Sequence, residues 1–201
     1  MSKVQICNRG LSTYLGQATI TSFDDSSPAA EQCTLHYDDT VETIFEAHWW
    51  HFATGRQVLA ELVNDRPCEW LFKYARPAEA AIIRWVNKPT SARVLIEMGE
   101  DPAAPIELVA DVIYSNVQFA SCEYTKIITD TSKYPRHFAN AISAQMAAVM
   151  AMPLTEDLKR ARNAADQADM LLDKAMVIDE QQTPPIKFQT TPAYLKARGI
   201  S

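Results

Sequence analysis

The feature that most constrains the fold is a repeat of small apolar residues between positions 158 and 175. Apolar residues recur there at alternating steps of three and four, at Leu158, Ala161, Ala165, Ala168, Leu172 and Ala175. This spacing places them on one face of an α-helix. Alanine lets two helices approach toward the short end of the usual interaxial range of about 8–10 Å. The repeat therefore predicts a helix-packing seam inside a tight helical bundle.

The segment before this seam predicts the helix that packs against it. Residues 134–157 read YPRHFANAISAQMAAVMAMPLTED, a stretch rich in alanine and methionine. Pro153 cannot continue a helix, and Thr155, followed by two acids, is expected to start the next one. Methionine fills irregular gaps between closely packed helices. We expect these two helices to form neighbouring walls of one bundle.

The N-terminal fifty residues predict two more helices. Val4, Cys7, Leu11 and Tyr14 share one helix face over 3–15, and Gly16 stands where a C-terminal cap belongs. Ser27 followed by Pro28 is a strong helix start, and the apolar stripe from Ala30 continues to about Trp50.

The middle of the chain is rich in proline and in β-favouring residues. Strands are expected over 93–98, 106–114 and 117–128, with a turn over EDPAAP between the first two. The predicted fold is mainly α (α+β). An antiparallel helical bundle (about 1–50 and 134–182) carries a small antiparallel β-rich insertion (about 51–133), as one domain over 1–182.

An extended arm is expected over residues 183–201. It is basic, with a charge of +3, whereas the net charge of −6 for the whole chain leaves −9 on residues 1–182. It is either a disordered tail or a docking arm, because spaced anchors in an extended basic segment suit a groove or a sheet edge. The candidate interface residues of this arm are Ile186, Lys187, Phe188, Tyr194, Leu195, Lys196 and Arg198.

Composition and motifs favour a structural protein over an enzyme. The chain has 5 glycines and no glycine-rich phosphate-binding motif, and no nucleophile motif occurs. Two pairs have metal-ligand spacing, Cys33 with His36 and His48 with His51, but they fall on an apolar stripe and in an aromatic cluster. No catalytic, cofactor-binding or metal-binding residue is therefore expected.

The 4 cysteines are widely spaced, which predicts free thiols in a reducing cytosol, with two disulfides as the alternative. The polar start predicts no signal peptide, and no apolar run reaches the roughly 18 residues of a membrane span. The acidic net charge argues against a protein that binds a nucleic-acid backbone by charge alone.

Two segments carry a resemblance to a known family. Residues 6–53, ICNRGLSTYLGQATITSFDDSSPAAEQCTLHYDDTVETIFEAHWWHFA, resemble the N-terminal signature of bacteriophage head-to-tail adaptor proteins, the tail tubular protein A family of short-tailed phages. The matching positions are Asn8, Leu11, Leu15, Gly16, Ile20, Phe23, Asp24, Asp25, Ser27, Ala30, Cys33, Tyr37, Trp50, Phe52 and Ala53. Residues 130–157 resemble the second signature of that family. The chain departs from the family pattern at Gly10, His48 and Glu79.

The resemblance implies a virion protein assembled in the host bacterial cytoplasm. Such subunits form a ring, usually of twelve copies, that joins the portal protein to the tail nozzle protein around a channel through which DNA passes without sequence-specific binding. Neither a cofactor nor a membrane is implied. Two alternatives remain at this point: a cytosolic helical binding or adaptor module unrelated to phage, and a small enzyme whose site is assembled from scattered residues.

Overall fold

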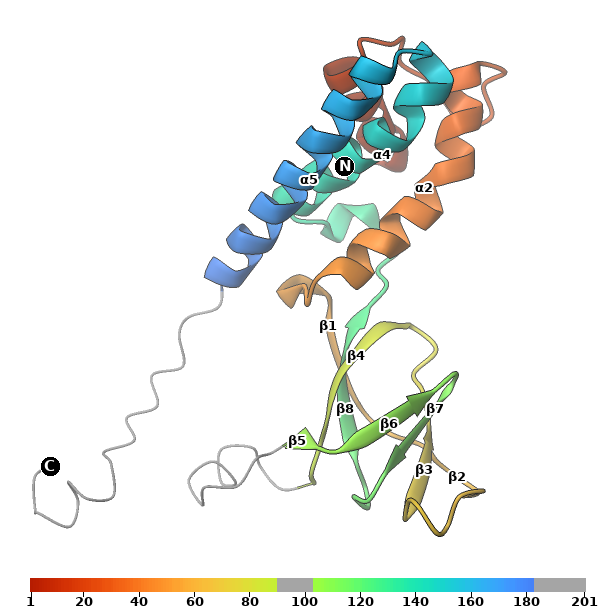
Figure 1. Ribbon diagram of the computed structural model, residues 1–201, viewed down its shortest axis with the longest axis vertical. Coiled ribbons are helices and arrows are strands. Elements are labelled where there is room, and N and C mark those ends of the chain that lie inside the picture. Colours follow the sequence, from red (N-terminus) through yellow and green to blue (C-terminus); the bar gives the residue numbers. More distant parts are fainter. Residues whose placement is uncertain (90–102, 183–201) are drawn as a thin grey trace, which may run out of the picture.

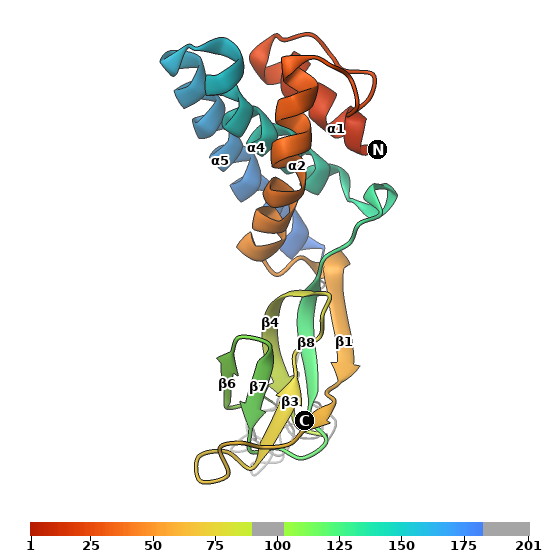
Figure 2. The same cartoon turned by 90° about the vertical axis from the view of Figure 1, so that its right-hand side faces the viewer.

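Helices and strands occupy opposite ends of an elongated molecule (Figures 1 and 2). The structure is a computed structural model that describes residues 1–89 and 103–182. One end holds the helices, in the order α1 (Lys3–Arg9), the π-helical turn η1 (Gly10–Leu15), α2 (Pro28–Ala47), α4 (Arg136–Thr155) and α5 (Leu158–Gln181). The predicted α+β class is confirmed. The expected arm lies outside the described residues.

The signature residues near the N-terminus close the turns between the first helices. Gly16 adopts the left-handed conformation, with φ of 64°, directly after η1, as the sequence predicted. The Asn8 side chain then holds the following loop. It donates to the backbone carbonyl oxygen of Ile20 and accepts from the backbone amide of Ile20, each at 2.8 Å. Ser27 caps α2 by accepting from the amide of Ala30.

Helix α4 is the centre of the bundle and contacts α1, η1, α2 and α5. Its buried residues are mostly small or flexible: Phe138, Ala139, Ala141, Ile142, Ser143, Ala144, Met146, Ala147, Met150 and Ala151. Its length and hydropathy of 1.2 would suit a membrane span, but 56% of that window is buried within the protein. Packing inside the bundle therefore accounts for its apolar composition.

Gly10 is a point of close approach to α4. A Cβ atom at Gly10 would lie 2.7 Å from the backbone oxygen of Ser143, a distance that real Cβ atoms do not reach. The backbone of Gly10 is ordinary right-handed helix, so the glycine is required by packing and not by its φ angle. The N-terminal helix thus rests directly on the backbone of α4.

The seam of α5 is real but rotated relative to the sequence prediction. Ala168 and Ala175 are buried, and Ala161 and Leu172 are partly buried against the core, as expected. Leu158 is 57% exposed and Ala165 is also exposed, so their assignment to the packing face was wrong. Ala164 is buried in place of Ala165. An α-helix has 3.6 residues per turn, so a sequence repeat with steps of three and four shifts gradually around the helix surface.

The break between α4 and α5 also differs from the prediction. Pro153 lies inside the last turn of α4, which ends at Thr155. Glu156 then adopts the left-handed conformation, and Asp157, not Thr155, caps α5 by accepting from the amides of Lys159 and Arg160. Proline has no backbone N–H to donate within a helix, and α4 ends two residues after Pro153.

Two antiparallel sheets form the other end of the molecule, where the sequence predicted one. The first has the order β1-β8-β4-β5, and the second has the order β2-β3-β7-β6. The strands are β1 (Thr54–Val58), β2 (Glu61–Leu62), β3 (Phe72–Ala75), β4 (Ala80–Asn87), β5 (Ala103–Ala104), β6 (Ile106–Val109), β7 (Val112–Ser115) and β8 (Ser121–Lys126). Side chains from both sheets share a core that includes Tyr74, Val86, Ile113 and Cys122.

The strand predictions were partly wrong. The single strand expected over 106–114 is the hairpin β6–β7, which turns at Ala110 and Asp111, with φ of 49° at Ala110. The strand expected over 117–128 is the shorter β8, and the one expected over 93–98 lies outside the described residues. Strands β1 to β4 were not predicted individually, because Pro67 and Pro77 obscured a periodic pattern.

The corrected seam leads to a direct comparison of two alanines. Ala168→Leu should lower the free energy of unfolding by about 1–3 kcal/mol, because the larger side chain overpacks the contact between α4 and α5. Ala165→Leu, on the exposed side of the same helix, should change it by less than about 0.5 kcal/mol. Urea denaturation of both variants measures the difference, and equal midpoints would contradict the observed rotation of the seam.

A second comparison tests the contact of η1 with α4. Gly10→Ala should cost about 1–3 kcal/mol of unfolding free energy, since its Cβ would meet the backbone of Ser143. Thr13→Ala, at an exposed position of the same turn, is the control and should be nearly neutral. If Gly10→Ala raised the thermal midpoint, α1 and η1 would not rest on α4 as closely as described.

Candidate functional site

The chain passes between the helical end and the sheets next to Trp50, which lies between α2 and β1. The Trp50 side chain is fully buried, and its indole Nε1 donates to the carbonyl oxygen of Ile44 at 2.7 Å. Its ring contacts Phe138 edge to face at 4.8 Å between ring centroids and His48 at 4.9 Å. Aromatic pairs of this geometry add to the stabilisation from burial. Trp50 therefore fixes how the chain leaves α2.

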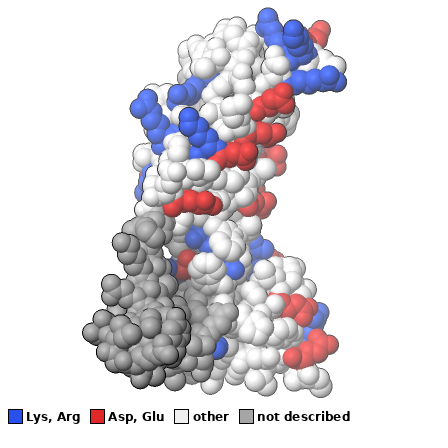
Figure 3. Space-filling model, turned by 60° about the vertical axis from the view of Figure 1, so that its left-hand side comes forward, with Lys and Arg blue, Asp and Glu red and all other residues white. Residues whose placement is uncertain are grey.

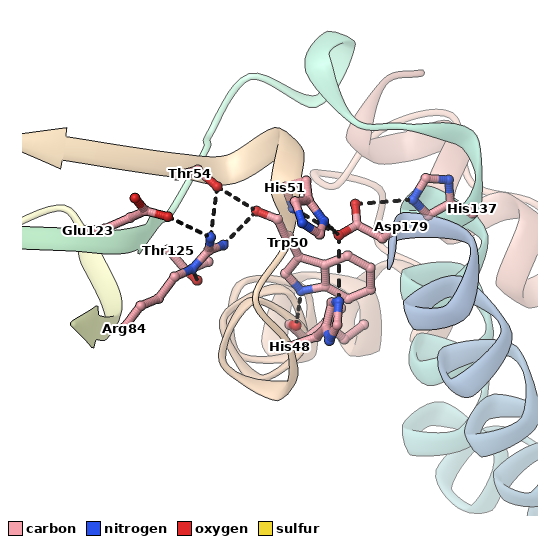
Figure 4. A network of polar contacts seen from close by, with 10 residues as sticks. His48, Trp50, His51, Thr54, Arg84, Glu123, Thr125, His137 and Asp179 are labelled. Atoms are coloured by element: carbon pink, nitrogen blue, oxygen red, sulfur yellow. Dashed lines mark hydrogen bonds and ion pairs between the residues drawn. The ribbon is translucent and has the colours of Figure 1, made fainter. Parts of the chain in front are cut away.

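A buried carboxylate, Asp179, reaches the same place from the last turns of α5 (Figure 4). It is 0% exposed and accepts from two groups of His51, the backbone amide at 2.9 Å and ring Nδ1 at 2.8 Å. Residue 51 begins the short helix η2 (His51–Ala53), which leads into β1. The end of α5 is thereby attached to the start of the β half.

Two further imidazoles point toward Asp179 without a hydrogen bond. Nε2 of His48 is 3.5 Å from one carboxylate oxygen, and Nε2 of His137 is 3.8 Å from the other. Within the described residues, these two nitrogens and Oδ1 of Asp179 are buried and have no hydrogen-bond partner. Buried polar atoms without partners are rare and costly. The carboxylate with three imidazoles is thus the least satisfied polar cluster in the protein interior.

Burial dominates the protonation of His48. It lowers the pKa of this imidazole, while the negative charges of Asp179 and Glu180 oppose the shift and His51 and Arg84 add to it. His48 therefore resists taking up a proton although a carboxylate lies nearby.

Arg84 joins the β half to the same segment. Its side chain is only 4% exposed, and it donates to the carbonyl oxygen of Trp50 at 2.8 Å and to Oγ1 of Thr54 at 2.9 Å. The carboxylate of Glu123 lies 3.6 Å away and balances its charge. Burial lowers the pKa of Arg84, whereas Glu123 and Asp179 raise it, so the two carboxylates act on one cation. A continuous polar network thus spans both halves, and we call it the junction.

The junction has part of the chemistry of a catalytic site but not the whole. The Asp179–His51 pair has the geometry in which a carboxylate orients a general base. Among the described residues, however, no serine, threonine or cysteine hydroxyl or thiol hydrogen-bonds to His51. No group of three or more His, Cys, Asp or Glu side chains in the described ranges is arranged to hold a metal ion. The contacts that are present join the end of α5 and strand β4 to the segment around Trp50.

The structure places the two residue pairs that were considered as metal ligands in different surroundings. Cys33 is buried in the helical core, with its sulfur 3.6 Å from that of Met150, while His36 is only half-buried. His48 and His51 do lie together, but around Asp179 and His137, which the sequence pattern did not indicate. All four cysteines are free thiols.

Signals for the missed residues were present in the sequence. Asp179 follows the buried Ala175 by four residues. The spacing that places Ala168 and Ala175 on the packing face of α5 therefore places this acid there too. Arg84 interrupts the otherwise apolar strand AAIIRWV. Charges in such places are seldom buried unless they are paired. The candidate arm residues, Ile186 to Arg198, lie outside the described residues, so their role stays a prediction.

The sequence matches no protein-family model, and no curated protein matches it.

The lowered pKa of His48 leads to a prediction for acid stability. Below its ordinary value of about 6.5, the unfolded chain binds a proton that folded His48 resists, so stability should fall as the pH drops from about 7 to 5. His48→Phe keeps a ring against Trp50 and removes the titration. Its free energy of unfolding should therefore depend less steeply on pH than that of the wild type.

Phe52→Leu is the control, because it weakens the same aromatic cluster without removing a titrating group. It should lower stability at every pH and keep the wild-type slope. Parallel slopes for wild type and His48→Phe in urea titrations at pH 5, 6 and 7 would contradict this assignment.

Proposed function

We propose that this protein is a head-to-tail adaptor of a short-tailed bacteriophage. It would be a virion protein without enzymatic activity, assembled in the bacterial cytoplasm as a ring of about twelve copies around the DNA channel. The ring would join the portal protein to the tail nozzle protein. The observation that carries this proposal is the order of the architecture: two N-terminal helical segments, a β module, then two long antiparallel helices. The family resemblance implies that same order.

Four of the positions that carry the resemblance support the proposal because each of these four has a structural task. Asn8 and Gly16 shape the first loop, Ser27 starts α2, and Trp50 fixes the exit from the bundle. Residues that only filled a core could be exchanged for others of similar size. Residues that close turns and junctions specify one chain path, so a match at these positions favours a shared fold.

The junction supports a mechanical role. A subunit that connects two larger assemblies has to keep its two ends in a fixed relation while force passes through it. Asp179 attaches the end of α5 to His51, and Arg84 attaches β4 to Trp50 and Thr54. These contacts lie where the segment after α2 leads into β1 (Figure 1), and the ring contact between Trp49 and Trp85 joins the same two halves.

The charge of the chain is compatible with a DNA channel. Residues 1–182 carry a net charge of −9, which disfavours tight binding to the phosphate backbone. DNA could therefore slide through a ring of such subunits without being held. The +3 charge of residues 183–201 would instead favour docking of this segment on an acidic protein surface.

Removal of the arm tests the proposed attachment. A chain that ends at Gln182 should unfold at nearly the same urea concentration as the full chain, yet fail to co-sediment with portal rings. The full-length double variant Phe188→Ser/Tyr194→Ser should show the same loss, because it removes the two aromatic anchors and keeps the charge. The control Thr190→Ser should co-sediment like wild type. If the truncated protein binds portal rings as the full chain does, the arm is not needed for attachment and this part of the proposal is wrong.

A further inference from the structure

The outer face of α5 carries an acidic stripe with two apolar side chains. Asp166, Asp169, Asp173 and Glu180 follow one another at helical spacing, and all four are exposed. Met170 and Val177 lie on the same face, 68% and 52% exposed. None of the four carboxylates forms an ion pair with another described residue. The stripe lies opposite the buried alanines of α5, so residues 1–89 and 103–182 of one copy leave it uncovered.

A groove of complementary character lies between α1 and the start of α4. It has a volume of ≈ 570 Å³ and is lined by Met1, Gln5, Arg9, Tyr134, Arg136 and Ala139. Arg9 donates to the side chain of Asn140, while Arg136 is exposed and has no ion pair among the described residues. The two guanidinium groups therefore line the groove together with the apolar parts of Tyr134 and Ala139.

Two acids that act on Tyr134 in the groove wall are themselves close to lysines. Asp38 and Asp130 act on Tyr134 from a distance and contribute to the raised pKa of its hydroxyl, which burial dominates. Asp38 is paired with Lys3 at 3.0 Å, and Asp130 lies 4.0 Å from Lys133. The positive charges of Arg9 and Arg136 therefore remain available to an external carboxylate.

The stripe and the groove lie on opposite flanks of the helical half. Figure 2 shows α5 on one side of the bundle and α1 on the other, with α4 and α2 between them. In Figure 3, acidic side chains run in a row along one side of the helical half, whereas basic ones gather at its upper end and along the opposite edge. A contact between two different surfaces on opposite flanks can repeat from copy to copy.

We infer that the acidic stripe of α5 in one copy docks in the α1–α4 groove of the next copy. Met170 enters the apolar part of the groove, and Asp169 and Asp173 pair with Arg9 and Arg136. The contact is head-to-tail, so it leaves a free stripe at one end and a free groove at the other, and it closes only as a ring. This inference rests on the proposed ring and names the surfaces that form it.

Disulfide trapping between two chains, each with one introduced surface cysteine beside the buried Cys7, Cys33 and Cys122, tests the contact. In a Cys68→Ser background, which removes the exposed native thiol, one chain carries Met170→Cys and the other Gln5→Cys. At millimolar protein and low salt, oxidation should trap a dimer of the two different chains, and each chain alone should give little. Added salt should reduce the yield, because exposed charges that guide the contact are screened.

Charge-reversal variants test whether the carboxylates of Asp169 and Asp173 contribute to the contact. Adding Asp169→Lys/Asp173→Lys to the Met170→Cys chain should lower the trapped fraction about tenfold, and Arg136→Glu on the Gln5→Cys chain should restore most of it. Glu61→Lys/Asp111→Lys reverses two exposed acids of the β half and should leave the yield unchanged. A circular dichroism spectrum confirms that each variant is folded.

The outcomes separate this inference from the proposed function. Rings on the portal without trapping between positions 170 and 5, or equal trapping with the Asp169→Lys/Asp173→Lys chain, would overturn the inference and leave the adaptor proposal standing. Charge-dependent trapping in a protein that never forms rings on a portal would support the contact and overturn the adaptor.

Discussion

The close contact between α4 and the helices around it is the constraint on which the helical half depends. Small residues are frequent at the buried positions of both α4 and α5, with Ala141, Ala144 and Ala147 in α4 and Ala164, Ala168 and Ala175 in α5. Because these residues fill little space, the helices lie close enough for Asp179, four residues beyond Ala175, to reach His51. Without that approach, the buried carboxylate would not meet the residues that lead into the β half.

The junction converts this packing into a defined orientation of two dissimilar halves. Buried carboxylates are costly unless they are paired, so Asp179 stabilises the structure only in the arrangement that gives it both hydrogen bonds from His51. Arg84 imposes a similar condition from the other side, through Trp50 and Thr54. Such a polar network specifies one relative position of the halves, which suits a subunit that links a portal to a nozzle.

Local signals in the sequence predicted much of the fold. Caps and small-residue spacing identified the four long helical segments, because those signals act within a few residues. The rotation of the seam to Ala164, the split of 106–114 into a hairpin and the pairing of two sheets depend on contacts between distant segments. The junction was missed for the same reason. His48 directly follows α2, whereas His137 lies in α4 and Asp179 in α5, and the spacing of His48 and His51 showed only one part of the cluster.

The most direct test of the proposed function is the mass and shape of the assembly on its proposed template. Full-length protein mixed with the portal ring of the same phage would be examined by negative-stain electron microscopy and by mass measurement of the purified complex. The account predicts an added ring on one face of the portal, with a mass increase of about twelve subunits. A protein that stays a compact 22.5 kDa monomer and adds no mass to the portal would contradict it.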